Sequence, residues 1–236
     1  MSIKHKKNFY EKYGKRVLDI VLSGMALIIL SPILLLLSAV GAVMMKGNPF
    51  FTQLRPGKDE KIFKLVKFCS MTNEKDENGN LLPDHVRLTK YGKFLRATSL
   101  DELPELWNIF KGDMSIVGPR PQLVRDMVFM TQEQRKRHNV RQGLTGLAQV
   151  SGRNNMSWER KFDYDLQYIE NISFINDMKI IFKTVEKVLK KDGITTDGME
   201  TAEDLGDYLL RIQVVSVNEY IKKQEKAKEM VEMYGL

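Results

Sequence analysis

Two adjacent carboxylates, Asp101 and Glu102, are the strongest candidates for chemistry in the sequence. They lie in the segment RATSLDELPE, which runs from Arg96 to Glu105. A carboxylate is ionised at neutral pH and can act as a nucleophile. A neighbouring carboxylate supplies oxygen atoms, which are the ligands that magnesium prefers. The pair therefore indicates phosphate chemistry, with attack by Asp101 and with both side chains beside a magnesium ion.

A structural role for the same residues stays open. Ser99 and Glu102 have the spacing of a capping box at a helix start, but Pro104 would then lie inside the helix, where it costs stability. If Asp101 is the cap of a helix over residues 101–111, Pro104 falls in the first turn, where no N–H is required. Position alone favours capping and catalysis equally.

Four basic residues could contact phosphate oxygens: Lys67, Arg96, Arg120 and Arg153. Arg120 lies between two prolines, which limit the backbone around it, and Arg153 lies in a glycine-rich turn, where a backbone can approach a ligand closely. The fork of an arginine suits diphosphate oxygens. Each of these bases, taken singly, also fits a surface or structural salt bridge.

The composition of the chain limits the classes of ligand and surface that it can bind. The chain has 236 residues, a net charge of +7 and one cysteine, so an intramolecular disulfide is impossible and a zinc site is not expected. Two basic blocks, residues 1–16 and 46–72, flank an apolar segment. The net charge suits an anionic partner, which could be nucleic acid, a lipid surface or phosphorylated substrates, and the position of the two blocks favours a membrane surface over nucleic acid.

The apolar segment runs from Ile20 to Met45 without a charge, which is long enough for a membrane helix. Ser31-Pro32 lies near its middle and predicts a bend. Two halves of about 12 residues would each be too short to cross, and both flanks are basic, so we expect a re-entrant hairpin. A tilted spanning helix is the alternative. Asp19 is expected to pair with Lys15 or Arg16.

The remaining pattern predicts an α/β domain. Strands are expected at 49–55 and 61–69 around the Pro56-Gly57 turn, and a strand end at 114–121. Helices are expected at 101–111, 124–138, 157–170 and 174–191, followed by an acidic loop at 197–207 and a helical tail at 208–236. The helix at 174–191 has an apolar face and several lysines, so it either lies on the bilayer or packs against the core.

Other enzyme motifs fit poorly. The sequence has no Walker-A loop, no G-x-G-x-x-G and no G-x-S-x-G. Asp163-Tyr164-Asp165 matches the D-x-D signature of metal-dependent glycosyltransferases, which makes direct glycosyl transfer an alternative function. Because this motif falls inside an amphipathic helix, we interpret it as part of a solvated helix face.

Five ordered blocks resemble one family. They are FFTQLRPG (50–57), FKLVKF (63–68), LRATSLDELPELWNIFKGDMSIVGPRP (95–121), RQGLTGLAQVSGRN (141–154) and YIENISFINDMKII (168–181). Together they resemble the monotopic phosphoglycosyl transferases, the bacterial sugar transferase family, in its small single-domain members. The resemblance covers about residues 10–195 and leaves the role of the tail open.

The resemblance implies transfer of a sugar-1-phosphate from a UDP-sugar to undecaprenyl phosphate, with release of UMP. Asp101 matches the nucleophile that forms a covalent phosphosugar intermediate, and Glu102 its acidic partner near Mg²⁺. Arg96, Arg120 and Arg153 match basic positions of the family. Ser31-Pro32 matches the bend of its re-entrant hairpin. A non-catalytic membrane scaffold remains a further alternative.

The expected architecture follows from these implications. It is a compact α/β enzyme of the cytoplasmic face of the bacterial inner membrane, with a re-entrant helical hairpin, interfacial amphipathic helices and a small β-sheet. Residues 1–16 form a basic interfacial N-terminus, 17–45 the membrane helix, 46–195 the catalytic domain, and 196–236 the acidic loop and helical tail. Membrane lipids and, through the tail, a second copy of the chain are possible partners.

Overall fold

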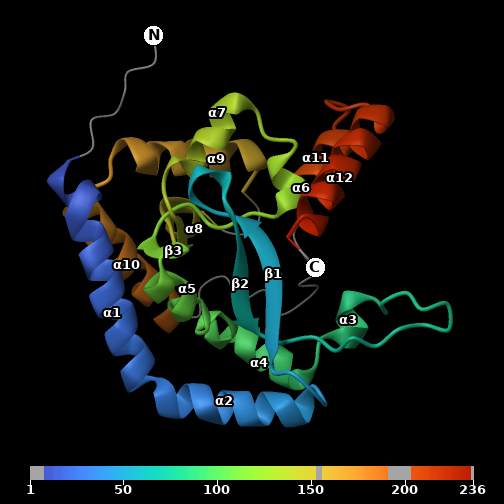
Figure 1. The fold of residues 1–236 in the computed structure, drawn as a ribbon, viewed down its shortest axis with the longest axis horizontal. Coiled ribbons are helices and arrows are strands. Elements are labelled where there is room, and N and C mark those ends of the chain that lie inside the picture. The colour runs from blue at the N-terminus through green and yellow to red at the C-terminus, as the bar shows by residue number, and fades with distance from the viewer. Residues whose placement is uncertain (1–7, 153–155, 191–202, 235–236) are drawn as a thin grey trace.

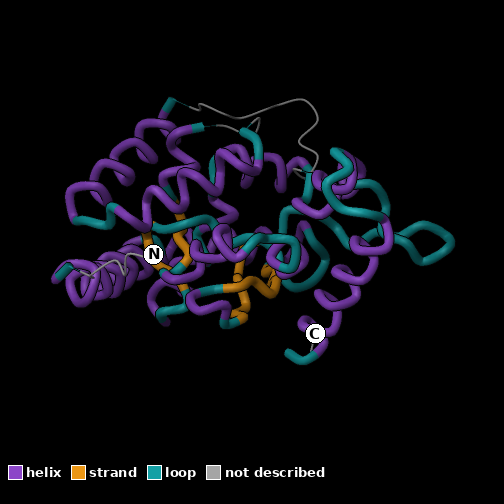
Figure 2. The backbone as a smooth tube through the Cα atoms, turned by 90° about the horizontal axis from the view of Figure 1, so that it is seen from above, coloured by secondary structure: helices purple, strands orange, loops and turns teal. Residues whose placement is uncertain are grey.

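A computed structural model of the chain describes residues 8–152, 156–190 and 203–234. The described chain is mixed α/β and mostly helical (Figure 1). Its strands form two separate two-stranded sheets, where the sequence predicts a single small sheet, and helices make up most of the rest of the described chain (Figure 2). The first two long helices, α1 and α2, form an L-shaped edge around these central elements (Figure 1).

A bent pair of helices forms this edge. After a short π-helical turn, Tyr10–Gly14, helix α1 spans Lys15–Ile29 and helix α2 spans Ser31–Met44. Pro32 lies in the first turn of α2, where its missing N–H costs nothing, so the break falls at the residue before Ser31. The helix axis bends by 63° between the two segments, which confirms the predicted bend. Among the described residues, only this bent pair, and no single helix, has the length and apolar composition of a membrane span.

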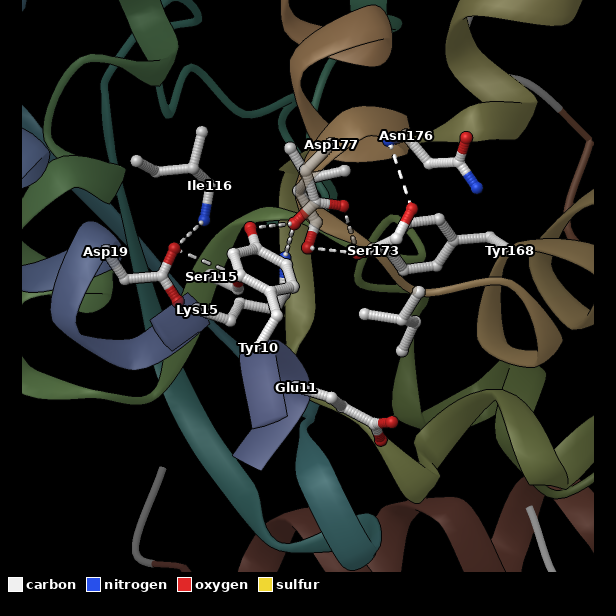
Figure 3. Close-up of polar contacts among 12 residues, drawn as sticks. Tyr10, Glu11, Lys15, Asp19, Ser115, Ile116, Tyr168, Ser173, Asn176 and Asp177 are labelled. Carbon is white, nitrogen blue, oxygen red and sulfur yellow. Dashed lines mark hydrogen bonds and ion pairs between the residues drawn. The ribbon is translucent and has the colours of Figure 1, made fainter. Parts of the chain in front are cut away.

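Two buried aspartates fasten α1 to the rest of the domain (Figure 3). Asp19 accepts hydrogen bonds from the Ser115 hydroxyl at 3.0 Å and from the Ile116 N–H at 2.9 Å. Asp177 pairs with Lys15 at 2.5 Å and also accepts from two tyrosine hydroxyls. The predicted pairing of Asp19 with its helical neighbours is therefore wrong. Asp19 lies on the buried face of α1 and accepts hydrogen bonds from two residues of the strand over residues 114–117.

The first strands form the predicted hairpin. Strand β1 (Phe50–Pro56) pairs antiparallel with β2 (Ile62–Phe68), and a 3₁₀ turn, Lys58–Glu60, lies between them. Helices α3 (Asp84–Arg87) and α4 (Lys90–Ala97) follow, then the 3₁₀ turn η3 (Leu100–Glu102) and helix α5 (Glu105–Lys111). Asn108 of α5 accepts from the Val66 N–H at 3.1 Å and donates to the Lys64 carbonyl at 2.7 Å. These two hydrogen bonds fix the position of α5 along β2.

Short elements occupy the middle of the chain. Strand β3 (Met114–Val117) pairs in parallel with β4 (Gln142–Thr145), and α8 (Leu147–Ser151) follows β4. Between the strands lie α6 (Val124–Met127), α7 (Gln132–Arg135) and the 3₁₀ turn η4 (Lys136–Asn139). The single helix predicted over 124–138 is therefore wrong. Thr131 forms a capping box with Gln134 and starts α7 afresh, which divides the segment.

The two predicted amphipathic helices are present as α9 (Trp158–Glu170) and α10 (Phe174–Leu189). Helix α9 buries Trp158 and Phe162 in a core cluster, whereas α10 turns much of its apolar face outward. The exposed apolar side chains of α10 are Phe174, Ile175, Phe182, Val185 and Val188. Of the two alternatives for α10, this exposure favours contact with a surface outside the domain.

The C-terminal tail packs on the domain as helices α11 (Leu205–Arg211) and α12 (Val217–Glu232), which lie beside α6 (Figure 1). Leu205 and Val215 enter a core cluster with Phe129 and Trp158. The loop predicted at 197–207 is thus helical from Leu205 onward, and its residues 197–202 lie outside the described part. The tail is an integral layer of the fold.

This packing predicts that the tail contributes to stability. Ala227 of α12 is 4% exposed and lies in a cluster with Leu54 and Val124. Ala227→Asp would bury an unpaired charge and should lower the free energy of unfolding by about 3 kcal/mol. The exposed Lys228→Asp is the control in a thermal-unfolding measurement. Equal melting temperatures for the two variants would mean that α12 does not dock as described.

Candidate active site

Asp101 and Glu102 lie on the 3₁₀ turn η3, between α4 and α5. Ser99 precedes the turn in the left-handed region (φ 54°), and α5 begins only at Glu105, after Pro104. Of the two roles left open for Asp101, the structure therefore excludes the cap of α5, and the predicted start of this helix at residue 101 is wrong. Pro104 occupies the cap position of α5, since it needs no N–H there, and Asp101 is left outside the helix.

Glu102 is held by two cations from different parts of the chain. Lys67 of β2 contacts its Oε1 atom at 2.8 Å, and the Arg120 guanidinium contacts the same atom at 2.6 Å. Burial alone would raise the pKa of Glu102, but the charges of Arg120 and Lys67 outweigh that effect and lower the pKa to about 2. Glu102 is thus a fixed negative charge at neutral pH.

Glu105 is a third carboxylate that the sequence analysis did not single out. It is 3% exposed and lies 3.1 Å from the same Lys67 ammonium group. Burial raises its pKa to about 7, against the charge of Lys67 and with added repulsion from Glu102. Its position three residues after Glu102, which places both on one side of a helical turn, is the signal that could have found it.

Asp101 differs from both neighbours because its carboxylate has no hydrogen bond or ion pair within the described part of the chain. Burial and then the negative charge of Glu102 raise its pKa, while Lys67, Arg120 and Arg96 oppose that rise. The side chain is only partly exposed. The Asp101 carboxylate therefore has oxygen atoms that accept no hydrogen bond from the described residues, and three cations lie close enough to act on its charge. This arrangement suits attack on an anionic phosphate.

The other predicted bases have mixed outcomes. Arg96 lies within electrostatic range of Asp101, while its own guanidinium donates to the Ser70 hydroxyl at 3.0 Å. Arg153 lies outside the described residues. Arg55 of β1 joins the cluster unpredicted: it donates to the Pro121 carbonyl at 3.1 Å, and burial together with the charge of Arg120 lowers its pKa to about 10.

Backbone contacts hold the loop that carries Arg120. The Gly118 N–H donates to the Thr145 carbonyl at 2.9 Å, and the Gly143 N–H donates to the Pro119 carbonyl at 2.8 Å. A Cβ atom on Gly143 would lie 2.1 Å from the Gly118 nitrogen, so no larger residue fits at position 143 without moving this loop. The two glycines allow β3 and β4 to approach closely, which brings Arg120 to the turn η3, where Asp101 and Glu102 lie.

The carboxylates fit magnesium only as a partial ligand set. No group of three or more His, Cys, Asp or Glu side chains with metal-binding geometry occurs among the described residues. Magnesium, however, usually keeps several waters and takes one or two carboxylates plus substrate phosphates. The open oxygens of Asp101, next to those of Glu102, fit that mode of binding.

The D-x-D motif does not form a metal site. Asp163 is exposed on α9, whereas Asp165 is 4% exposed and pairs with Arg137 at 2.8 Å. The prediction of a solvated helix face is correct for Asp163 and wrong for Asp165. Because the two carboxylates differ in this way, the motif supports direct glycosyl transfer poorly.

Comparisons with known proteins find similarity over most of the chain. Residues 10–191 match the family model described as bacterial sugar transferase. The chain is 48% identical over 189 residues to the "Uncharacterized sugar transferase EpsL" of Bacillus subtilis, which covers 80% of this chain and 94% of that protein. It is 43% identical over 183 residues to the "UDP-glucose:undecaprenyl-phosphate glucose-1-phosphate transferase" of Klebsiella pneumoniae, covering 73% of this chain and 39% of the relative.

A third relative is the "Undecaprenyl-phosphate galactose phosphotransferase" of Salmonella typhimurium, at 37% identity over 200 residues. That alignment covers 77% of this chain and 42% of the relative, so the chain spans about two-fifths of the length of both named transferases. The chain belongs to the bacterial sugar transferase family. Its class is phosphoglycosyl transferase, and the predicted family resemblance is confirmed.

Proposed function

We propose that this protein transfers a sugar-1-phosphate from a UDP-sugar to undecaprenyl phosphate, through a covalent intermediate on Asp101. Two relatives named above carry undecaprenyl phosphate in their names, and one of them also carries the UDP-sugar donor. The observation that carries the proposal is the Asp101 carboxylate, which has no partner among the described residues and faces the charges of Lys67, Arg96 and Arg120.

The first half-reaction forms a bond between an Asp101 carboxylate oxygen and the β-phosphorus of the UDP-sugar. The bond from that phosphorus to the bridging oxygen breaks, and UMP leaves with the electron pair. In the second half-reaction a phosphate oxygen of undecaprenyl phosphate attacks the same phosphorus. The bond to Asp101 breaks, the carboxylate is regenerated, and the product is an undecaprenyl-diphosphate sugar.

The cations act on the charge that this transfer moves. Arg120 and Lys67 already hold Glu102, and their remaining donors suit the oxygens of a diphosphate. Asp101 and Glu102 would hold magnesium, which supplies further positive charge at the phosphates when it is bound. Arg55 lies close enough to Arg120 for the two charges to interact, and it adds positive charge that favours anion binding.

The second substrate requires a lipid surface. Helices α1 and α2 expose a set of large apolar side chains: Val17, Ile20, Val21, Met25, Ile28, Ile29, Ile33, Leu35, Leu36, Val40, Val43 and Met44. A patch of this size marks an interaction surface. We place the bent pair in the cytoplasmic leaflet of the bacterial inner membrane as a re-entrant hairpin, with the apolar face of α10 at the interface. Asp101 then meets a lipid-borne phosphate at the boundary.

The identity of the leaving nucleotide tests this reaction. The protein in detergent, given undecaprenyl phosphate, Mg²⁺ and a panel of UDP-sugars, is expected to release UMP with at least one donor. Release of UDP would indicate direct glycosyl transfer instead. No nucleotide release from any donor, by folded protein, would favour a non-catalytic scaffold.

A further inference from the structure

Arg137 and Asp165 form a buried ion pair outside the turn η3, which carries Asp101 and Glu102. Arg137, in the η4 turn, has 0% exposure, and its Nε atom donates to Asp165 Oδ2 of α9 at 2.9 Å. Removing two charges from water costs several kcal/mol per ion, and apolar replacements of such pairs are often equally stable. Stability alone is therefore a weak reason for this pair.

A third contact links the pair to the site. The Nη2 atom of Arg137 donates to the backbone carbonyl of Arg120 at 2.6 Å. The Arg120 side chain in turn donates to Glu102 Oε1 at 2.6 Å. Hydrogen bonds therefore connect Asp165 to Arg137 and Arg137 to the Arg120 backbone, and the Arg120 side chain reaches from that backbone to Glu102, next to Asp101.

The backbone at Arg120 has few other ways to move. Pro119 and Pro121 have fixed φ angles, and a residue before proline is restricted to extended conformations. Rotation about ψ of Arg120 turns its carbonyl, and that carbonyl is the atom that Arg137 holds. Asp165, by fixing the fork of Arg137, fixes the direction of the donated hydrogen bond.

We propose that Arg137 and Asp165 are positioning residues, which set the Arg120 backbone and thereby direct the Arg120 guanidinium at Glu102 and the incoming diphosphate. The proposal rests on the proposed function for the diphosphate, and on geometry alone for the Arg120–Glu102 contact. The proposal gives Asp165, the second aspartate of the D-x-D motif, a role in which it binds neither a metal nor a sugar.

The Arg137→Lys variant tests the proposal. Lysine keeps the charge opposite Asp165, but its donors lie at a single nitrogen on a flexible stem, so it cannot reproduce the two fixed donor directions with which the arginine fork holds Asp165 and the Arg120 carbonyl. We expect kcat to fall about 10- to 100-fold, as for other small displacements of catalytic groups, with the melting temperature nearly unchanged. Arg135→Lys is the matched control, because Arg135 pairs with Glu60 and does not contact Arg120; its kcat should be unchanged.

A double-mutant cycle separates positioning from general destabilisation. In an Arg120→Ala background, Arg137→Lys is expected to cause no further loss of kcat, since its effect passes through Arg120. If the fold-losses of kcat in the two single variants multiply in the double variant, the proposal is overturned. So would a loss of kcat in Arg137→Lys that matches its loss of folded protein.

A structure of the Arg137→Lys variant gives a readout that does not depend on activity. The Arg120–Glu102 contact, 2.6 Å in the parent chain, should lengthen or break. An unchanged contact would overturn the positioning role even if the transferase reaction is established. Absence of UMP release from the parent protein would instead count against the proposed function and leave this structural test in force.

Discussion

Replacing Asp101 with asparagine is expected to abolish sugar-phosphate transfer and to remove any covalent phosphosugar adduct from the protein. An amide has the shape of the carboxylate but not its nucleophilicity, so the first half-reaction cannot begin. Loss of a nucleophile lowers kcat by about 10⁴-fold or more in enzymes with covalent intermediates. Radiolabelled UDP-sugar, followed by denaturing electrophoresis, measures the adduct directly. Because Asp101 has no hydrogen bond or ion pair among the described residues, the variant should fold normally.

Asp163→Asn is the matched control for this experiment, since Asp163 is an exposed aspartate of α9. It should retain parental activity and the adduct. Full activity in Asp101→Asn would end the covalent mechanism. Loss of activity in Asp163→Asn with retention in Asp101→Asn would revive the direct glycosyltransferase mechanism, which the burial of Asp165 disfavours.

The parts of the fold that local sequence determines could be predicted. The β-forming residues around Pro56-Gly57 indicated the hairpin, and Ser31-Pro32 indicated the bend between α1 and α2, because these signals act within a few residues. The same holds for α9 and α10, whose apolar periodicity extends over four turns or so. Helix starts do not follow from local sequence alone, because the effect of Pro104 on the turn at Asp101 depends on how the chain around it packs.

Contacts between distant segments could not be predicted in the same way. Asp19 and Asp165 both have the sequence pattern of ordinary helical acids, but each is buried against a partner from another element. Nothing in the spacing shows that Ser115 or Arg137 will face them, since that depends on the packing of β3 and η4. The site shows the same limit: its charged residue types were visible, whereas the sharing of Lys67 by two glutamates was not.

Lys67→Met is expected to have the second-largest effect, on stability and on activity together. The Lys67 ammonium group contacts Glu102 at 2.8 Å and Glu105 at 3.1 Å, and its side chain is 17% exposed. Removing one partner of a buried charge pair costs about 3–5 kcal/mol, and Glu105 can reduce this loss by taking up a proton. Loss of a preorganised cation near a transferring phosphate should also lower kcat by about 10²- to 10³-fold.

A second substitution separates these two effects. Adding Glu105→Gln to Lys67→Met removes the carboxylate that has lost its cation, so the double variant should recover much of the melting temperature. Its kcat should stay low, because the positive charge beside Asp101 is still missing. Lys64→Met on the exposed side of the same strand is the control and should change neither quantity. Recovery of kcat together with the melting temperature would show that Lys67 serves the fold alone, and the cationic site around Asp101 would then depend on the arginines.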